Sequence, residues 1–122
     1  MGDPEQIVRD FCAAWSRLDA DELAAFFTED GVYHNMPAAP VAGRVAVRDF
    51  IAGFSADWLE TDWEIVSIAA AGDRVFCERV DRTRTEKGEV ALPCLGVFEL
   101  ENGLIARWRD YFDLGTYPRA VG

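Results

Sequence analysis

The chain has 122 residues, half of them hydrophobic, with 12 basic and 22 acidic side chains and a net charge of −10. This length predicts one domain over residues 1–122, and the apolar fraction excludes an intrinsically disordered chain. The acidic balance argues against partners such as nucleic acid or an anionic membrane, because both require a basic footprint.

The cysteines and the single histidine restrict the chemistry further. Cys12, Cys77 and Cys94 lie in apolar runs without CxxC spacing, which predicts buried free thiols in a reducing compartment. The N-terminal segment has no apolar signal core and no apolar run reaches membrane-spanning length, so we expect a cytoplasmic location. His34 alone cannot build a Ser-His-Asp or Cys-His constellation or a multi-histidine metal site, although a carboxylate-only metal site stays open here.

The first half of the chain predicts three helices. Asp3-Pro4 is typical of a helix N-cap and first turn. The helix that follows repeats apolar side chains on one face: Ile7, Phe11, Ala14, Trp15 and Leu18. After a break at 19–21, a short second helix carries Leu23, Phe26 and Phe27. A short strand at 32–36 and a loop with Pro37, Pro40 and Gly43 precede a third helix over residues 45–56.

The second half predicts four strands, at about 63–71, 74–85, 89–101 and 104–113. The separators AGD, EKG and ENG are turn-like, and short turns favour antiparallel hairpins. Three helices followed by such strands predict an α+β fold. We expect a curved mixed or antiparallel sheet wrapped on about three N-terminal helices, cone-shaped with an internal pocket.

Two of these strands place charge where apolar side chains are expected, in the segments ERVDRTR and WRDYFDL. Side chains two apart share a face, so Arg79 and Asp81 continue an apolar row, and Asp110 shares its face with Trp108 and Phe112. If both rows face one interior, an arginine lies between two aspartates in an apolar cavity. Taken separately, the first pair could be an exposed ion pair, and Asp110 could cap a turn.

The strand at 32–36 also carries polar side chains of interest. Tyr33 and Asn35 share one face and could together hold a water molecule. His34 lies on the opposite face with Val32 and Met36. Both faces are mixed, so periodicity does not decide between an inward-facing polar pair and an exposed edge strand.

These segments together resemble a known family. In their order and spacing, the segments YHNMP, GR, ERVD, LGVFEL and WRDYFDL resemble those of limonene-1,2-epoxide hydrolases, within the SnoaL-like, nuclear-transport-factor-two-like superfamily. The resemblance covers about residues 7–114. The catalytic residues that it implies are Asp81, Arg79, Asp110, Tyr33 and Asn35.

The resemblance implies an epoxide hydrolase that adds water to a small apolar cyclic or aryl epoxide. The product would be a vicinal diol, formed in one step without a covalent intermediate, metal or cofactor. Asp81 would be the general acid, and Asp110 the general base acting on a water held by Tyr33 and Asn35; Arg79 would keep one carboxylate ionised. The implied substrate-binding wall is Trp15, Phe54, Trp58, Leu92, Cys94 and Phe112, with Cys12, Trp63 and Tyr117 beside them. The family also implies a homodimer.

Two alternatives remain open at the level of sequence. A ketosteroid-isomerase-like or SnoaL-like isomerase or cyclase would use an acid–base pair beside a carbonyl group, and needs no arginine between two aspartates. A noncatalytic binder of small ligands would retain binding when the aspartates are replaced. The superfamily fold alone implies no single activity.

Overall fold

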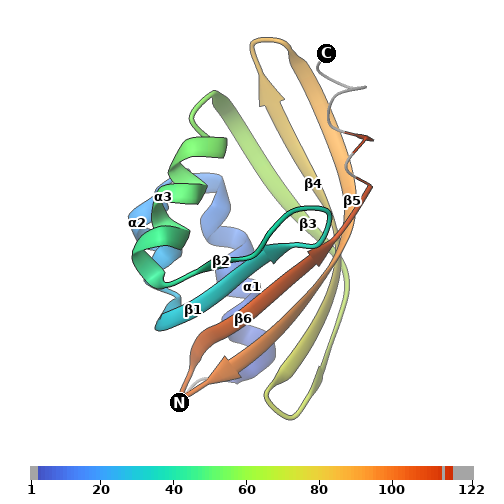
Figure 1. Ribbon diagram of the computed structural model, residues 1–122. Helices are drawn as coiled ribbons and strands as arrows, with labels where there is room; N and C mark the ends of the chain where they lie inside the picture. Colours follow the sequence, from blue (N-terminus) through green and yellow to red (C-terminus); the bar gives the residue numbers. More distant parts are fainter. Residues whose placement is uncertain (1–2, 114, 117–122) are drawn as a thin grey trace.

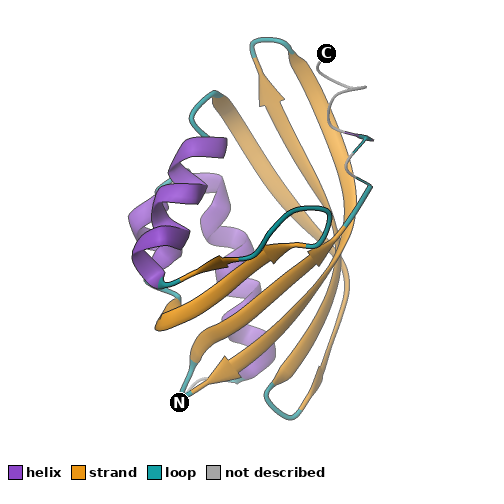
Figure 2. Ribbon diagram, viewed as in Figure 1, coloured by secondary structure: helices purple, strands orange, loops and turns teal. Residues whose placement is uncertain are grey.

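The computed structural model describes residues 3–113 and 115–116, and in this part of the chain three helices and one 3₁₀ turn pack against a curved sheet (Figures 1 and 2). The helical elements are α1 (Pro4–Ala14), η1 (Trp15–Arg17), α2 (Ala20–Ala24) and α3 (Arg44–Phe54). The strands are β1 (Phe27–Asn35), β2 (Val41–Ala42), β3 (Trp58–Ala71), β4 (Arg74–Thr85), β5 (Gly88–Glu101) and β6 (Leu104–Tyr111). The expected α+β fold is confirmed.

The six strands form one sheet in the order β2-β1-β6-β5-β4-β3. All neighbours are antiparallel except β1 and β6, which run parallel, so the sheet is mixed. The helices lie on one side of the sheet, which curves around them (Figure 2). Along the residues that the structure describes, no helix is long and apolar enough to cross a membrane.

The expected start of α1 is confirmed by its capping contact. The Asp3 carboxylate accepts a hydrogen bond from the backbone N–H of Gln6, and Pro4 occupies the first helical turn. The helix ends in the 3₁₀ turn η1, which stops at Leu18 because that residue is left-handed, with φ of 50°. Leu18 therefore lies beyond the helical face on which the sequence placed it.

The strand β1 begins at Phe27 rather than at residue 32. The sequence placed Phe26 and Phe27 on the second helix, which was wrong, because α2 ends at Ala24. Phe27 pairs with Ile105 of β6, and the register then shifts before Val32. Residues 28–30 are polar and Gly31 has no side chain. These residues span the irregularity and lack the alternation by which a strand is recognised.

Other strand ends differ because pairing with a neighbour decides them. β3 begins at Trp58, five residues earlier than expected, where it pairs with Thr85 at the end of β4. The two-residue strand β2 lies in the expected loop and pairs with β1. β6 ends at Tyr111, so Phe112 follows the strand instead of belonging to it.

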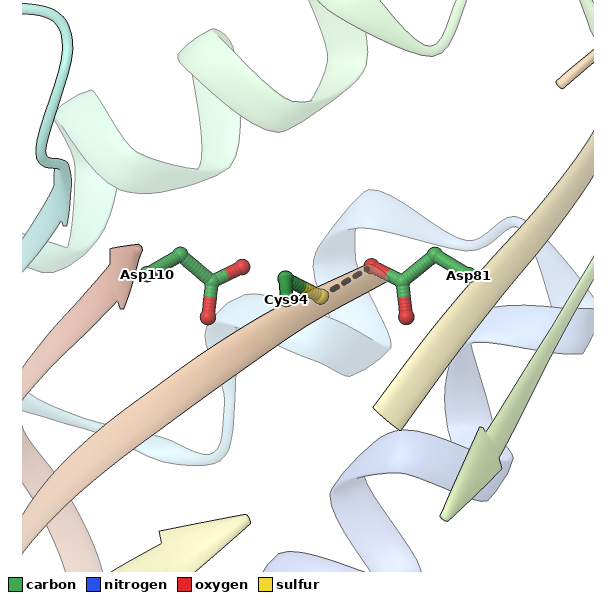
Figure 3. Close-up of side chains that lie close together, drawn as sticks. All are labelled: Asp81, Cys94 and Asp110. Atoms are coloured by element: carbon green, nitrogen blue, oxygen red, sulfur yellow. Dashed lines mark hydrogen bonds between the residues drawn. The ribbon is translucent and has the colours of Figure 1, made fainter. Parts of the chain in front are cut away.

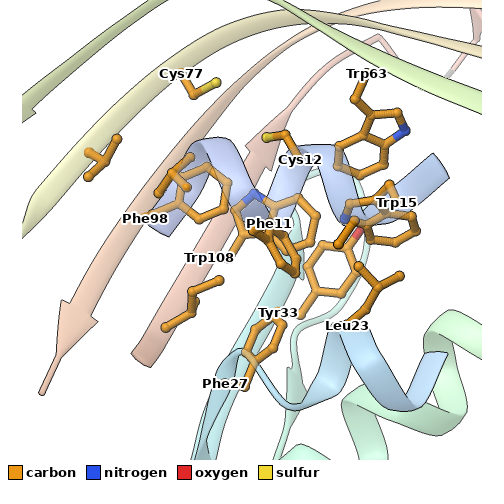
Figure 4. Packing of buried hydrophobic residues seen from close by; sticks show 14 of the residues in the cluster. Phe11, Cys12, Trp15, Leu23, Phe27, Tyr33, Trp63, Cys77, Phe98 and Trp108 are labelled. Atoms are coloured by element: carbon orange, nitrogen blue, oxygen red, sulfur yellow. The ribbon is translucent and has the colours of Figure 1, made fainter. Parts of the chain in front are cut away.

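The core between helices and sheet is built from aromatic side chains (Figure 4). Phe11 of α1 lies at its centre and makes edge-to-face contacts with five rings: Trp15, Phe26, Phe27, Phe98 and Trp108. Trp108 is also stacked between Tyr33 and Phe98. The polar side chains of β4 and β6 pack against this aromatic layer.

Candidate active site

The inward face of β4 changes from apolar to charged without becoming exposed. Its inward residues are Val75, Cys77, Arg79, Asp81, Thr83 and Thr85, all buried. Arg79 is 0% exposed, Asp81 6% and Asp110 of β6 4%. Both charged rows therefore face one interior as expected, and the readings of an exposed ion pair and of a turn cap are wrong.

Arg79 joins the two aspartates through its guanidinium group. Its Nε donates to Asp81 Oδ1 at 2.8 Å, and its Nη2 to Asp81 Oδ2 at 3.1 Å. Its Nη1 donates to Asp110 Oδ1 at 3.0 Å, and Nη2 donates also to Asp110 Oδ2. The planar fork of an arginine suits two carboxylates at once, and such pairing makes burial of the charges affordable.

Neighbouring side chains hold this arrangement in place. The guanidinium carbon of Arg79 lies 4.4 Å from the ring centroid of Trp63 and 5.5 Å from that of Trp108. The indole N–H of Trp108 donates to Asp110 Oδ1 at 2.8 Å. Gly96 of β5 pairs with Asp110, and a Cβ there would lie 2.7 Å from Arg79 Nη1. A glycine is therefore required for the guanidinium to reach Asp110.

The surroundings of the site shift the pKa values of its ionisable side chains. Burial raises the pKa of Asp81 to about 6, with Asp110 adding to the rise and Arg79 opposing it. Burial disfavours the charge on Arg79, but the two aspartates outweigh this and raise its pKa well above the usual value. Burial also raises the pKa of the Tyr33 hydroxyl, so that this side chain is a neutral donor and acceptor.

The structure decides the orientation of the strand that carries Tyr33 and Asn35. Tyr33 is 3% exposed and stacks on Trp108 with ring centroids 4.1 Å apart. Asn35 is half-buried and pairs with Asp110 along the parallel β1–β6 ladder. Both side chains thus belong to the inward face and line the same cavity as the aspartates.

This cavity has a volume of about 540 Å³ and opens between α3, the sheet and the residues after β1. Among the described residues, six aromatic side chains line its walls, namely Tyr33, Phe50, Phe54, Trp58, Trp63 and Phe112. Its other lining residues are Asn35, Pro37, Ala38, Asp57, Asp81, Leu92 and Asp110. A separate hollow of about 610 Å³ over β3, β4 and β5 contains none of the five expected catalytic residues.

Four of the six expected wall residues line the cavity: Phe54, Trp58, Leu92 and Phe112. Trp15 does not, because it is fully buried one layer deeper, stacked on Trp63 at 4.1 Å. Cys94 does not line it either; its thiol is buried and contacts the Asp81 carboxylate. Tyr117 falls outside the described residues.

Some lining residues were not expected from the sequence. Phe50 precedes Phe54 by one helical turn, and this i,i+4 spacing could have indicated a shared wall. Pro37 and Ala38 belong to the expected loop after β1 and offered no such signal. Asp57 is an exposed carboxylate at the cavity rim, in the turn between α3 and β3.

Asp81, Cys94 and Asp110 place potential ligand atoms within 4.8 Å of one another (Figure 3). The guanidinium of Arg79 already occupies both carboxylates. Burial raises the pKa of the Cys94 thiol, which disfavours the thiolate that a metal would bind. The donor set therefore suits a bound arginine better than a metal cation.

The chain belongs to the SnoaL-like domain family, whose model matches residues 8–108. The family lies in the superfamily that the sequence segments indicated. The match covers α1 from Val8 onward, the whole of α2, α3 and β4, and the strand β6 as far as Trp108.

Particular relatives refine this placement. The chain is 30% identical over 107 residues to the epoxide hydrolase EphG of Mycobacterium tuberculosis, covering 88% of this chain and 71% of that protein. It is similar to the structure of an LEH-like epoxide hydrolase of the same organism, with a TM-score of 0.83, 27% identity and coverage of 97% and 88%. A putative SnoaL-like polyketide cyclase from Shewanella putrefaciens shares the fold alone, with a TM-score of 0.87, 19% identity and coverage of 98% and 96%.

Proposed function

We propose that this chain is an epoxide hydrolase that adds water to a small apolar epoxide and releases a vicinal diol. One observation carries the proposal: Arg79 bridges Asp81 and Asp110 beside a cavity whose walls are largely aromatic. Opening an epoxide requires a proton for the leaving oxygen and removal of a proton from water. Two carboxyl groups of unequal protonation supply both.

The environment of the two aspartates supports unequal roles. Asp81 has its pKa raised to about 6, chiefly by burial, and is suited to carry the proton. Asp110 accepts hydrogen bonds from the indole N–H of Trp108 and from two N–H groups of Arg79, which fix its carboxylate beside the cavity. We therefore assign Asp81 as general acid and Asp110 as general base.

The proposed reaction is a single displacement. Asp110 takes a proton from a water held by Tyr33 and Asn35, and the water oxygen bonds to one ring carbon. The C–O bond of the epoxide breaks in the same step, and Asp81 transfers its proton to the leaving oxygen. A proton then passes from Asp110 to Asp81 through solvent or the product to restore the resting state.

The cavity supports the proposed substrate class. Its volume of about 540 Å³ lies within the range that small-molecule sites occupy. The aromatic walls provide apolar area for a cyclic or aryl group. The described lining residues include few polar groups that could orient a charged substrate. We propose a small cyclic or aryl epoxide on these grounds.

The test is incubation of purified protein with a panel of cyclic and aryl epoxides, followed by detection of diols. Turnover by the protein and not by its Asp81→Asn variant is expected. No diol from any member of the panel would contradict the proposal.

A second measurement uses ¹⁸O-labelled water in a single turnover with enzyme in excess. Direct attack places the label in the first diol, whereas an ester intermediate would leave the label in an aspartate.

We also propose that the chain forms a homodimer through the outer face of its sheet. Leu95 and Tyr111 pair across β5 and β6 on that face and are 40% and 42% exposed. Phe76 on β4 is 39% exposed as well. Light scattering after gel filtration measures the mass, and a monomer at micromolar concentration would contradict this expectation.

A further inference from the structure

Cys94 is a buried nucleophilic side chain for which the proposed mechanism has no use. It lies on β5, pairs with Arg79 of β4 and is 6% exposed. Its Sγ lies 3.5 Å from Asp81 Oδ2 (Figure 3). It also lies 3.9 Å from the backbone oxygen of Arg79. The thiol can therefore donate its proton either to the carboxylate or to the main chain.

The two aspartates receive similar sets of donors. Arg79 donates to both oxygens of each carboxylate, and among the described residues each carboxylate accepts from one further side chain. For Asp110 that donor is the indole N–H of Trp108 at 2.8 Å, which can only donate. For Asp81 it is the thiol of Cys94, a weaker donor with a second acceptor within reach.

We propose that Cys94 is a positioning residue for Asp81, and this inference rests on the proposed function. Its thiol donates to the carboxylate that forms when Asp81 gives its proton to the epoxide oxygen. While Asp81 is protonated, the thiol turns to the backbone oxygen of Arg79. A weak, reversible donor thus stabilises the product form of the acid without preventing its protonation.

The thiol is able to act in this way because it keeps its proton. Burial raises the pKa of Cys94, so the side chain remains S–H over the range in which Asp81 titrates. It is also a poor nucleophile in that form, which protects it from alkylation by an epoxide. Arg79, Asp110 and Tyr33 are the other titratable groups beside Asp81 in the described residues, and Asp57 lies at the cavity rim. Cys12 and Cys77 do not line the cavity and interact with Asp81 only through its charge.

The experiment compares Cys94→Val and Cys94→Ser, which remove or strengthen the donor with little change in size. The pKa of Asp81 is followed by ¹³C NMR of the carboxyl carbons, with Asp81→Asn used to assign the signal. We expect the pKa to rise by roughly half a unit in the valine variant and to fall by a similar amount in the serine variant. The alkaline limb of kcat/KM should move in the same order.

The control is Cys77→Val, which removes a buried thiol from the same sheet without touching the Asp81 carboxylate. A role in packing alone would leave the Asp81 titration unmoved in both Cys94 variants, and that result would overturn the inference. Should the valine variant fail to fold, Cys94→Ala takes its place as the variant without a donor. The NMR titration needs no turnover, so absence of diol with a shifted pKa would contradict only the proposed function.

Discussion

Arg79 is a fully buried cation, and its two carboxylate partners are what make that burial tolerable. It donates four hydrogen bonds to Asp81 and Asp110 and lies against the face of Trp63. Removal of one partner of a buried ion pair leaves an uncompensated charge, which costs about 3–5 kcal/mol. Amide substitutions keep the shape of each partner and are therefore the appropriate probes of chemistry.

Asp81→Asn and Asp110→Asn should each lower the rate of epoxide hydrolysis by at least about 10²-fold, because general acid–base catalysis contributes that much. The measurement is kcat/KM for diol formation, with circular dichroism to show that each variant is folded. Activity near that of the unmodified protein in a folded variant would show that the carboxylate in question has no catalytic role.

Gly96→Ala should disable the site although it adds only one methyl group. The new Cβ would lie 2.7 Å from Arg79 Nη1 and 3.0 Å from Asp110 Oδ1, both of which are held by hydrogen bonds. We expect at least a tenfold loss of kcat and lower stability, measured by diol formation and thermal unfolding. Gly53→Ala is the matched control, because nothing lies within 4 Å of its Cβ and alanine favours the helix α3. Equal behaviour of the two variants would contradict this account.

At the scale of elements, the contact between β1 and α3 shapes the cavity, because α3 supplies Phe50 and Phe54 to its wall. Arg44, the first residue of α3, donates to the backbone oxygen of Phe27 from Nε at 3.0 Å and from Nη2 at 2.7 Å. These bonds tie the start of the helix to the start of the strand.

Arg44→Met should lower the free energy of unfolding by about 1–3 kcal/mol, because it removes two charge-assisted hydrogen bonds to a partly buried carbonyl. We expect KM for the epoxide to rise more than kcat falls, since the helix carries wall residues and no proposed acid or base. Urea unfolding and steady-state kinetics measure these changes.

Arg48→Met on the same helix is the control. It removes only exposed ion pairs and should change the free energy of unfolding by less than about 1 kcal/mol. A larger effect at Arg48 would refute the argument.

The spacing of apolar residues predicted the ranges of those helices and strands that bury one continuous face. Helices α1 and α3 and the hairpin strands β4 and β5 lie close to their expected ranges, because their apolar residues repeat at the helical or strand spacing. Strand β1 was expected five residues too late, since its first part is polar and irregular where it pairs with β6. β2 has two residues, too few for a pattern.

At the scale of the whole molecule, Asp81 couples stability to pH. Its pKa is raised from 3.8 to about 6, chiefly by burial, so the folded protein binds this proton more tightly than the unfolded chain. The resulting stability is present in full below about pH 4 and is lost as the pH rises through 6. Relative to Asp81→Asn, the unmodified protein should therefore lose about 2–3 kcal/mol of unfolding free energy between pH 4 and 8.

Urea unfolding of both proteins at several pH values measures this difference, and the subtraction cancels the exposed ion pairs that they share. The alkaline limb of kcat/KM should also fall as Asp81 loses its proton. A free-energy difference that stays constant from pH 4 to 8 would mean that Asp81 titrates normally in the folded protein.

Turnover should be unchanged by EDTA, because Arg79 already occupies the carboxylates that a cation would need. The assay is diol formation before and after incubation with the chelator and gel filtration. Inhibition that a divalent ion reverses would contradict this expectation.

The fold class and the set of five polar residues that the structure brings to one interior were predictable from the sequence, whereas burial of the charged row of β4 was one of two interpretations that it left open. The prediction was possible because strand alternation assigns each side chain a face, and because the segments that carry these residues resemble one family. Tertiary structure alone decided the inward direction of Tyr33 and Asn35, the position of Trp15 beneath Trp63 and the contact of Cys94 with Asp81. These depend on the register between strands distant in the chain and on the depth of each side chain, and neither is encoded in local periodicity.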